Sequence, residues 1–301
     1  MNQELLAYTY SFSAVITFSV ASIGFTYFSK KVSPLWMNVF KSVVAFAAAL
    51  IFMLFLGKVV FEPIGKVWPF VVSGFIGLNL GDFFILSAYK RIGPGRTLIL
   101  FGFEPFFVGS FSYIFWGEQI HSIQFVAIIF FVMCLFLFGL EQFKKSGTWE
   151  VRGLCYALLG VILDSVGVLL TRYNYNIYPD FGGLEALFFR TGGALLSFIL
   201  LIPFVRMELV SQFKKLTFNE KWLAIISSFL GTFLTLVLYL QAIRVGKLAT
   251  VTSIVLVDPM MSTFFECVWL KLWPTRYLWM AIGCFVCAMF CLMYPQWSQG
   301  F

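Results

Sequence analysis

Charged residues are scarce in this 301-residue chain. Aspartate, glutamate, lysine and arginine together make up 12% of it, and it contains one histidine. A soluble domain is about a quarter charged, whereas this chain is 60% hydrophobic. A soluble core could not bury so much apolar surface, so most of the chain must face lipid or other membrane helices. The composition therefore predicts an all-α membrane protein.

The motifs of catalysis and of nucleotide hydrolysis are also missing. His121 alone cannot supply an HExxH zinc site, and no GxSxG nucleophile elbow is present. Gly246 and Lys247 lack the earlier glycine and the hydroxyl residue of a P-loop. We therefore expect no enzymatic activity, no cofactor, no metal ion and no ATP-driven step in this chain.

The six cysteines and the net charge of +7 do not indicate a separate function. All six cysteines lie in or beside apolar runs, as reduced packing residues do, and Cys284-x-x-Cys287 has no second pair nearby. The basic residues lie between apolar runs and not in one dense patch. That distribution is typical of membrane-surface loops, and it argues against nucleic acid as a partner.

Ten apolar runs are long enough to cross a bilayer, which takes about 20 residues. Short connectors join most of them, so neighbouring helices are expected to be antiparallel, and no soluble domain is expected. The runs are 5–28, 35–56, 67–89, 97–116, 122–140, 153–171, 184–205, 222–243, 248–270 and 277–294.

Two stretches of the chain repeat each other at a distance of 154 residues. Ala88 and Pro105 in the first correspond to Ala242 and Pro259 in the second, and an acid precedes each proline. Each half of the chain then contains five predicted spans. A unit with an odd number of spans enters the membrane in the opposite sense when it is repeated, which is the pattern of inverted repeats in transporters.

Lysine and arginine are unevenly divided between the two ends of this predicted bundle. Loops after odd-numbered spans hold 14 of them, and loops after even-numbered spans hold five. The positive-inside rule therefore places both termini outside the cytoplasm.

Seven charged residues within the apolar runs are candidates for a function, because a charge there costs about 2.5–3.5 kcal/mol on insertion scales. Such residues usually face the interior of a bundle and mark ion or substrate pathways. They are Lys41, Asp82, Glu104, Asp164, Arg190, Asp258 and Glu266.

Glu104 and Asp258 each precede a proline at equivalent positions of the two halves. One interpretation is a helix kink, at Pro105 and at Pro259, whose loosened backbone is satisfied by polar neighbours. The other is a broken helix that lines a water-filled site, with the acid as carrier of a proton or cation. The residues alone leave both interpretations open.

Two further groups of polar residues also have alternative interpretations. Asn79 and Asp82 share a helix face, as an interhelical hydrogen-bonding pair or as acceptors that line a cavity. Asp164 either pairs with Arg190 or Lys41, or faces the cavity. Lys41 and Arg190 hold equivalent positions in the second span of each half, and a structural ion pair is the expected role of each.

The two halves resemble the EamA repeat of the drug/metabolite transporter superfamily. The resemblance rests on 88–105 followed by Trp116-Gly117-Glu118, on 242–259, and on the basic residue in the second span of each half. The second half departs from the family pattern at 270–273, where a Gly-Glu pair is expected. The two EamA-like repeats are predicted at 8–140 and 153–294.

This resemblance implies two inverted five-helix repeats, about ten helices in all, around a cavity formed by the first, third and fourth helices of each. It implies a monomeric or loosely associated carrier of small organic solutes in the cell membrane, often an exporter. Alternating access would be driven by proton coupling or by the solute gradient. It also implies cytoplasmic termini, against the charge distribution. The candidate cavity residues on these helices are Asn79, Asp82, Glu104, Asp164, Gln241 and Asp258.

A flippase for a lipid-linked intermediate is the alternative function, since it would use a similar fold with a lateral opening between helices. A channel would lack paired inverted halves, and a lipid-modifying enzyme would need clustered histidine or aspartate at one interface. We therefore expect a secondary transporter whose partners are a small-molecule solute and the lipid bilayer.

Overall fold

A computed structural model describes residues 3–58, 61–104, 150–201, 208–246 and 275–298, with scattered residues between 107 and 147 and between 251 and 273. Within these residues every regular element is a helix and no strand occurs. This confirms the all-helical fold predicted from the composition.

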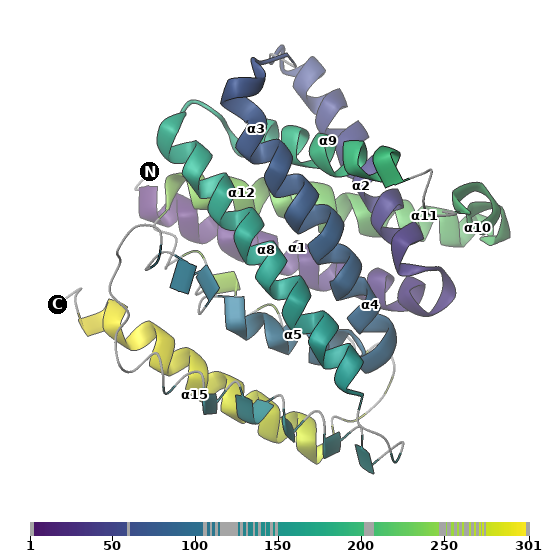
Figure 1. Cartoon of the computed structure of the whole chain (residues 1–301), viewed down its shortest axis with the longest axis vertical. Helices are drawn as coiled ribbons and strands as arrows, with labels where there is room; N and C mark the ends of the chain where they lie inside the picture. The colour runs from purple at the N-terminus through teal and green to yellow at the C-terminus, as the bar shows by residue number, and fades with distance from the viewer. Residues whose placement is uncertain are drawn as a thin grey trace.

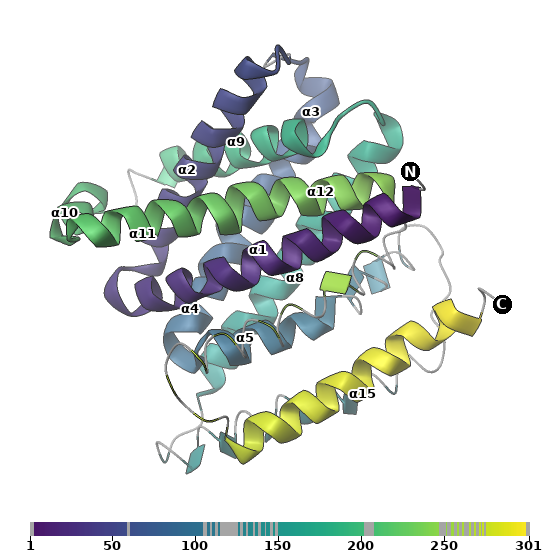
Figure 2. The ribbon, with the colours of Figure 1, turned by 180° about the vertical axis from the view of Figure 1, so that it is seen from behind.

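The described helices form a single bundle (Figure 1). In chain order they are α1 (Gln3–Lys31), α2 (Pro34–Phe55), α3 (Ile64–Ser73), η1 (Gly74–Gly81), α4 (Asp82–Ile92), α5 (Pro94–Leu100), η2 (Phe101–Phe103), α8 (Val151–Ile177), α9 (Gly183–Leu201), α10 (Leu209–Lys215), α11 (Phe218–Ser228), η3 (Phe229–Leu234), α12 (Thr235–Val245) and α15 (Arg276–Ser298). Both termini lie at the same edge of the bundle in both views (Figures 1 and 2).

Six of the helical stretches in the described part of the chain are long and apolar enough to cross a membrane. Each coincides with a span expected from the sequence, three in each half. The spans expected at 97–116, 122–140 and 248–270 are described only in part, and the span expected at 277–294 lies within α15, which is not one of the six. The full count of ten therefore stays a prediction. The six stretches are Leu5–Lys31, Pro34–Phe55, Ile64–Ile92, Val151–Ile177, Gly183–Leu201 and Phe218–Val245.

The two halves of the chain are packed into each other. The most extensive helix pairs each join the first half to the second: α1 packs on α12, α4 on α8, and α2 on α9. Figure 2 shows α1 and α12 running side by side along much of their length. Each half therefore buries much of its apolar surface against the other half along a shared interface.

The third span of each half contains a π-helical segment. In the first half this segment is η1, between α3 and α4, and in the second it is η3, between α11 and α12. The segments contain Gly77 and Gly231, which lie 154 residues apart like the repeated stretches. A π-helical turn widens a helix locally and is frequent at functional sites. The internal repeat is therefore visible in backbone geometry as well as in sequence.

Two glycines allow α9 to cross the third span of the first half at very short range. A Cβ on Gly74 would stand 1.8 Å from the carbonyl oxygen of Arg190, and one on Gly193 would stand 2.1 Å from that of Val71. Both obstructing atoms belong to the backbone, so a side-chain rotation could not relieve the clash. Small residues at such crossings let membrane helices approach closely, and here they place Arg190 beside η1.

We expect Gly193→Ala to destabilise the protein by about 1–3 kcal/mol, the usual cost of inserting atoms into a close-packed interior. The measurement is the thermal unfolding midpoint of the purified protein in detergent. Gly283→Ala is the matched control, because no described residue outside that turn of α15 has an atom within 4 Å of a Cβ at that position. Equal midpoints for Gly193→Ala and the wild type would contradict the close crossing.

Candidate functional site

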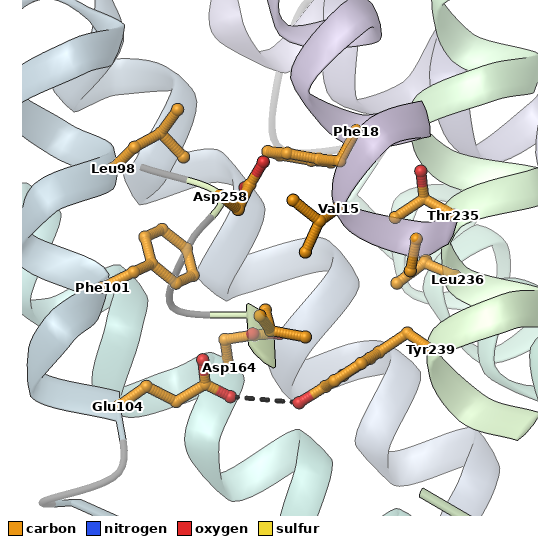
Figure 3. Close-up of a pocket in the computed structure, with 12 residues that line it drawn as sticks. Val15, Phe18, Leu98, Phe101, Glu104, Asp164, Thr235, Leu236, Tyr239 and Asp258 are labelled. Atoms are coloured by element: carbon orange, nitrogen blue, oxygen red, sulfur yellow. Dashed lines mark hydrogen bonds between the residues drawn. The ribbon is translucent and has the colours of Figure 1, made fainter. Parts of the chain in front are cut away.

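A pocket lies between the two halves of the bundle, and we call it the interface pocket (Figure 3). Its volume of about 120 Å³ leaves room for several water molecules or a small solute. The described lining contains three carboxylic acids and no lysine, arginine or histidine. It consists of Ala14, Val15, Phe18, Leu98, Phe101, Glu104, Asp164, Thr235, Leu236, Tyr239, Val255 and Asp258.

Both halves contribute walls to the interface pocket. The first half supplies residues of α1, α5 and η2, ending at Glu104, and the second half supplies residues of α8 and α12 together with Asp258. Most of the lining side chains are apolar, so the carboxyl groups are the principal polar features of the cavity. Figure 3 shows Glu104 and Asp164 near the end of the pocket where Tyr239 enters, with Asp258 farther along it.

Glu104 and Asp258, the equivalent acids of the repeat, are each held by a hydroxyl group of the other half. The Tyr239 hydroxyl donates a hydrogen bond to Glu104 Oε1 at 3.3 Å, drawn as the dashed line in Figure 3. The Ser19 hydroxyl donates one to Asp258 Oδ1 at 2.7 Å. Both acids are buried, with exposed fractions of 6% and 8%. The two acids therefore join the halves across the pocket by reciprocal hydrogen bonds.

Asp164 reaches the pocket from α8, and Arg190 approaches it from α9. A Cβ placed on Gly77 would lie 3.3 Å from Asp164 Oδ1 and 3.5 Å from Arg190 Nη2, so both side chains come up against η1. Arg190 is 1% exposed, and its Nε and Nη1 groups have no hydrogen-bond partner among the described residues. A guanidinium that is buried to this extent attracts neighbouring carboxylates strongly, because little solvent screens the interaction.

Lys41 and Asp82 form an ion pair that joins α2 to α4 within the first half. The Lys41 side chain is 9% exposed and that of Asp82 is 18% exposed, so the pair is largely shielded from its surroundings. Neither residue belongs to the described lining of the interface pocket. The first two charges of the apolar runs therefore neutralise each other beside the pocket.

Asn79 and Gln241 also lie in contacts between helices and not on the described pocket lining. The Asn79 carbonyl oxygen accepts a hydrogen bond from Asn38 Nδ2 at 2.8 Å, and its side-chain amide donates one to the Ser197 hydroxyl. Gln241 Oε1 accepts a hydrogen bond from the Gly183 N–H at 2.9 Å, at the start of α9. Asn79 thus connects the two halves outside the pocket, whereas Gln241 joins α12 to the start of α9 within the second half.

Three hydroxyl-bearing residues at the site were not singled out from the sequence: Ser19, Thr235 and Tyr239. Hydroxyl side chains are common in membrane helices, where they usually bond to the backbone of their own helix, so nothing in their spacing marks these three. Pro105 and Pro259, where helix kinks were expected, lie outside the described residues, and the kinks stay predictions.

We expect Lys41→Met to destabilise the protein by about 3–5 kcal/mol, because Asp82 would keep a shielded charge without its partner. Asp82→Asn in the same chain should recover much of that loss. Lys66→Met, which breaks the exposed pair with Glu62, is the control and should cost at most about 1 kcal/mol. Thermal unfolding in detergent measures all three variants, and a double variant no more stable than Lys41→Met would contradict the pairing.

The sequence matches a known protein family along nearly its whole length. The model of the EamA-like transporter family matches residues 5–140 and again residues 151–294. No curated protein matches the sequence. A crystal structure of another protein, 19% identical, covers 97% of this chain and 98% of its own with a TM-score of 0.69, which shows a shared fold. The chain belongs to the EamA-like transporter family and is a multi-pass membrane transporter.

Proposed function

We propose that this protein is a secondary transporter that moves a small organic solute across the cell membrane by alternating access, with the interface pocket as its central site. The observation that carries the proposal is the pair of equivalent acids, Glu104 and Asp258, which line one pocket and are each bonded to the opposite half. Transporters built from inverted repeats place their site at the interface of the repeats. Export is the direction that the family resemblance favours.

The reciprocal hydrogen bonds give the solute a way to change the conformation. A ligand group that binds Glu104 competes with the Tyr239 hydroxyl, and one that binds Asp258 competes with the Ser19 hydroxyl. Either exchange removes a bond between the halves at that point. A ligand shifts a conformational equilibrium only through such a difference in its contacts between the two states, so the acids serve both binding and movement.

The lining favours a solute that carries a positively charged group on an apolar body. Carboxyl groups in apolar surroundings need a cation, a proton or hydrogen-bond donors to compensate their burial. Arg190 lies beside Asp164 at Gly77 and can compensate that carboxylate, but the described lining offers no basic side chain to Glu104. Phe18, Phe101 and Tyr239 supply aromatic rings, which attract cations. An organic amine or quaternary ammonium compound of small size fits this combination.

The same acids can couple transport to protons. A carboxylate in the pocket that binds a proton cannot at the same time pair with the charged group of the solute, so the two compete. Competition of this kind exchanges a proton for a solute across the membrane without nucleotide. No feature of the described residues favours the flippase alternative, which needs an opening from the site to the lipid.

We expect Glu104→Gln and Asp258→Asn each to lower pH-dependent uptake by about tenfold or more, because neutral amides cannot exchange a proton for a cation. The assay uses proteoliposomes and the best solute from a screen of amino acids, nucleobases and organic cations. Glu150→Gln is the control, because Glu150 pairs with Arg91 away from the interface pocket.

Three variants together decide whether the acids couple transport to protons. If Asp82→Asn, Glu104→Gln and Asp258→Asn each leave pH-dependent uptake unchanged, coupling through these acids is excluded. If uptake itself persists but loses its dependence on pH in the two pocket variants, the pocket is a coupling site. If both pocket variants also stop binding the solute, the acids hold the solute as well.

A further inference from the structure

A second cavity opens at the end of the bundle where α1, α4 and α10 finish. Its volume is about 430 Å³, and it shares no described lining residue with the interface pocket. We call it the basic cleft, because four lysines line it: Lys30, Lys31, Lys90 and Lys215. One acid, Glu208, lies among the same residues.

The basic cleft carries an excess of positive charge. Lys31 is paired with Glu220 of α11. Lys30, Lys90 and Lys215 have no ion pair with any described residue. A lysine in the last turn of a helix interacts favourably with the helix dipole, which accounts for each of them singly. The helix dipole does not explain why the ends of three separate helices place their lysines at one cavity.

Two lining residues of the basic cleft, Ser33 and Gln212, are hydrogen bonded to each other across the two halves. Gln212 Oε1 accepts a hydrogen bond from the Ser33 N–H at 3.0 Å, and Gln212 Nε2 lies 3.4 Å from the Ser33 hydroxyl. Ser33 is also the N-cap of α2, so the positive end of a 22-residue helix begins at the cleft. The Ser33 hydroxyl accepts the Trp36 N–H, so it is the dipole of this helix that adds to the positive field of the lysines.

We propose that the basic cleft binds a phosphate group, carried either by an anionic phospholipid of the surrounding membrane or free in solution. Clustered lysines at the membrane end of a helix bundle attract anionic lipid headgroups. Lys30 and Lys90 belong to the first half and Lys215 to the second. A phosphate bound among them therefore bridges the halves at this end of the bundle, away from the transported solute.

The test removes the three unpaired lysines from the full-length protein. Lys30→Gln, Lys90→Gln and Lys215→Gln are combined, and native mass spectrometry in neutral detergent follows the binding of added phosphatidylglycerol or phosphatidylcholine. We expect the affinity for phosphatidylglycerol to fall about tenfold or more, since each lysine near the surface contributes to attraction of anionic lipid. Binding of phosphatidylcholine should stay weak and unchanged.

A matched variant controls for net charge. Lys144→Gln, Arg152→Gln and Lys214→Gln remove the same charge from exposed side chains that do not line the basic cleft. This triple variant should bind phosphatidylglycerol like the wild type. Should the cleft variants disturb folding, Lys90→Gln alone still gives a measurable loss of severalfold. Equal losses in the two triple variants, or none in the cleft variant, would overturn the proposal.

Inorganic phosphate separates the two sources of the phosphate group. If inorganic phosphate displaces phosphatidylglycerol from the wild type and raises its thermal midpoint, and does neither in the cleft variant, the site serves a free phosphate. If it displaces no lipid, the ligand is the lipid headgroup. Neither result depends on transport, so the basic cleft and the interface pocket are tested independently.

Discussion

The cost of placing charge inside an apolar bundle is the constraint on which this structure depends. A charge at the centre of a membrane helix costs about 2.5–3.5 kcal/mol unless it is paired, hydrogen bonded or directed to a cavity. Lys41 and Asp82 meet this demand as an ion pair. Glu104 and Asp258 meet it through hydroxyl groups and a pocket. Because the hydroxyl groups come from the opposite half, the burial of these two acids is inseparable from the association of the halves.

The association of the halves has two different kinds of contact. At the crossing of α9 with the third span, glycines bring backbone against backbone, and no polar group has to be exchanged for the helices to stay there. At the interface pocket, the contact includes two side-chain hydrogen bonds, which the proposed solute would replace. The first kind gives a rigid packing surface and the second a breakable one. A transporter that alternates between two arrangements of its halves needs both, because movement requires contacts that differ between states.

Much of the architecture followed from the sequence, and part of the site did not. The helical membrane fold and the equivalence of the two halves followed from apolar runs and from spacing, which are properties of the chain itself. The sequence pattern does not distinguish Asp82 from Glu104, since both are acids within apolar runs. The structure separates them, because Asp82 is close enough to Lys41 to form an ion pair while Glu104 lines the pocket. Rotation of each helix about its axis decides this, and periodicity alone does not reveal it.

The sequence by itself determined that this is a duplicated all-helical membrane protein with acids at matching positions 104 and 258. Local hydrophobicity and repeat spacing suffice for that, since both are independent of how helices pack. Only the tertiary structure decided that these two acids share one pocket, and that Ser19 and Tyr239 bond to them. Ser19 and Asp258 are separated by 239 positions in the chain, and Glu104 and Tyr239 by 135. Both contacts therefore form only when the two halves are packed together.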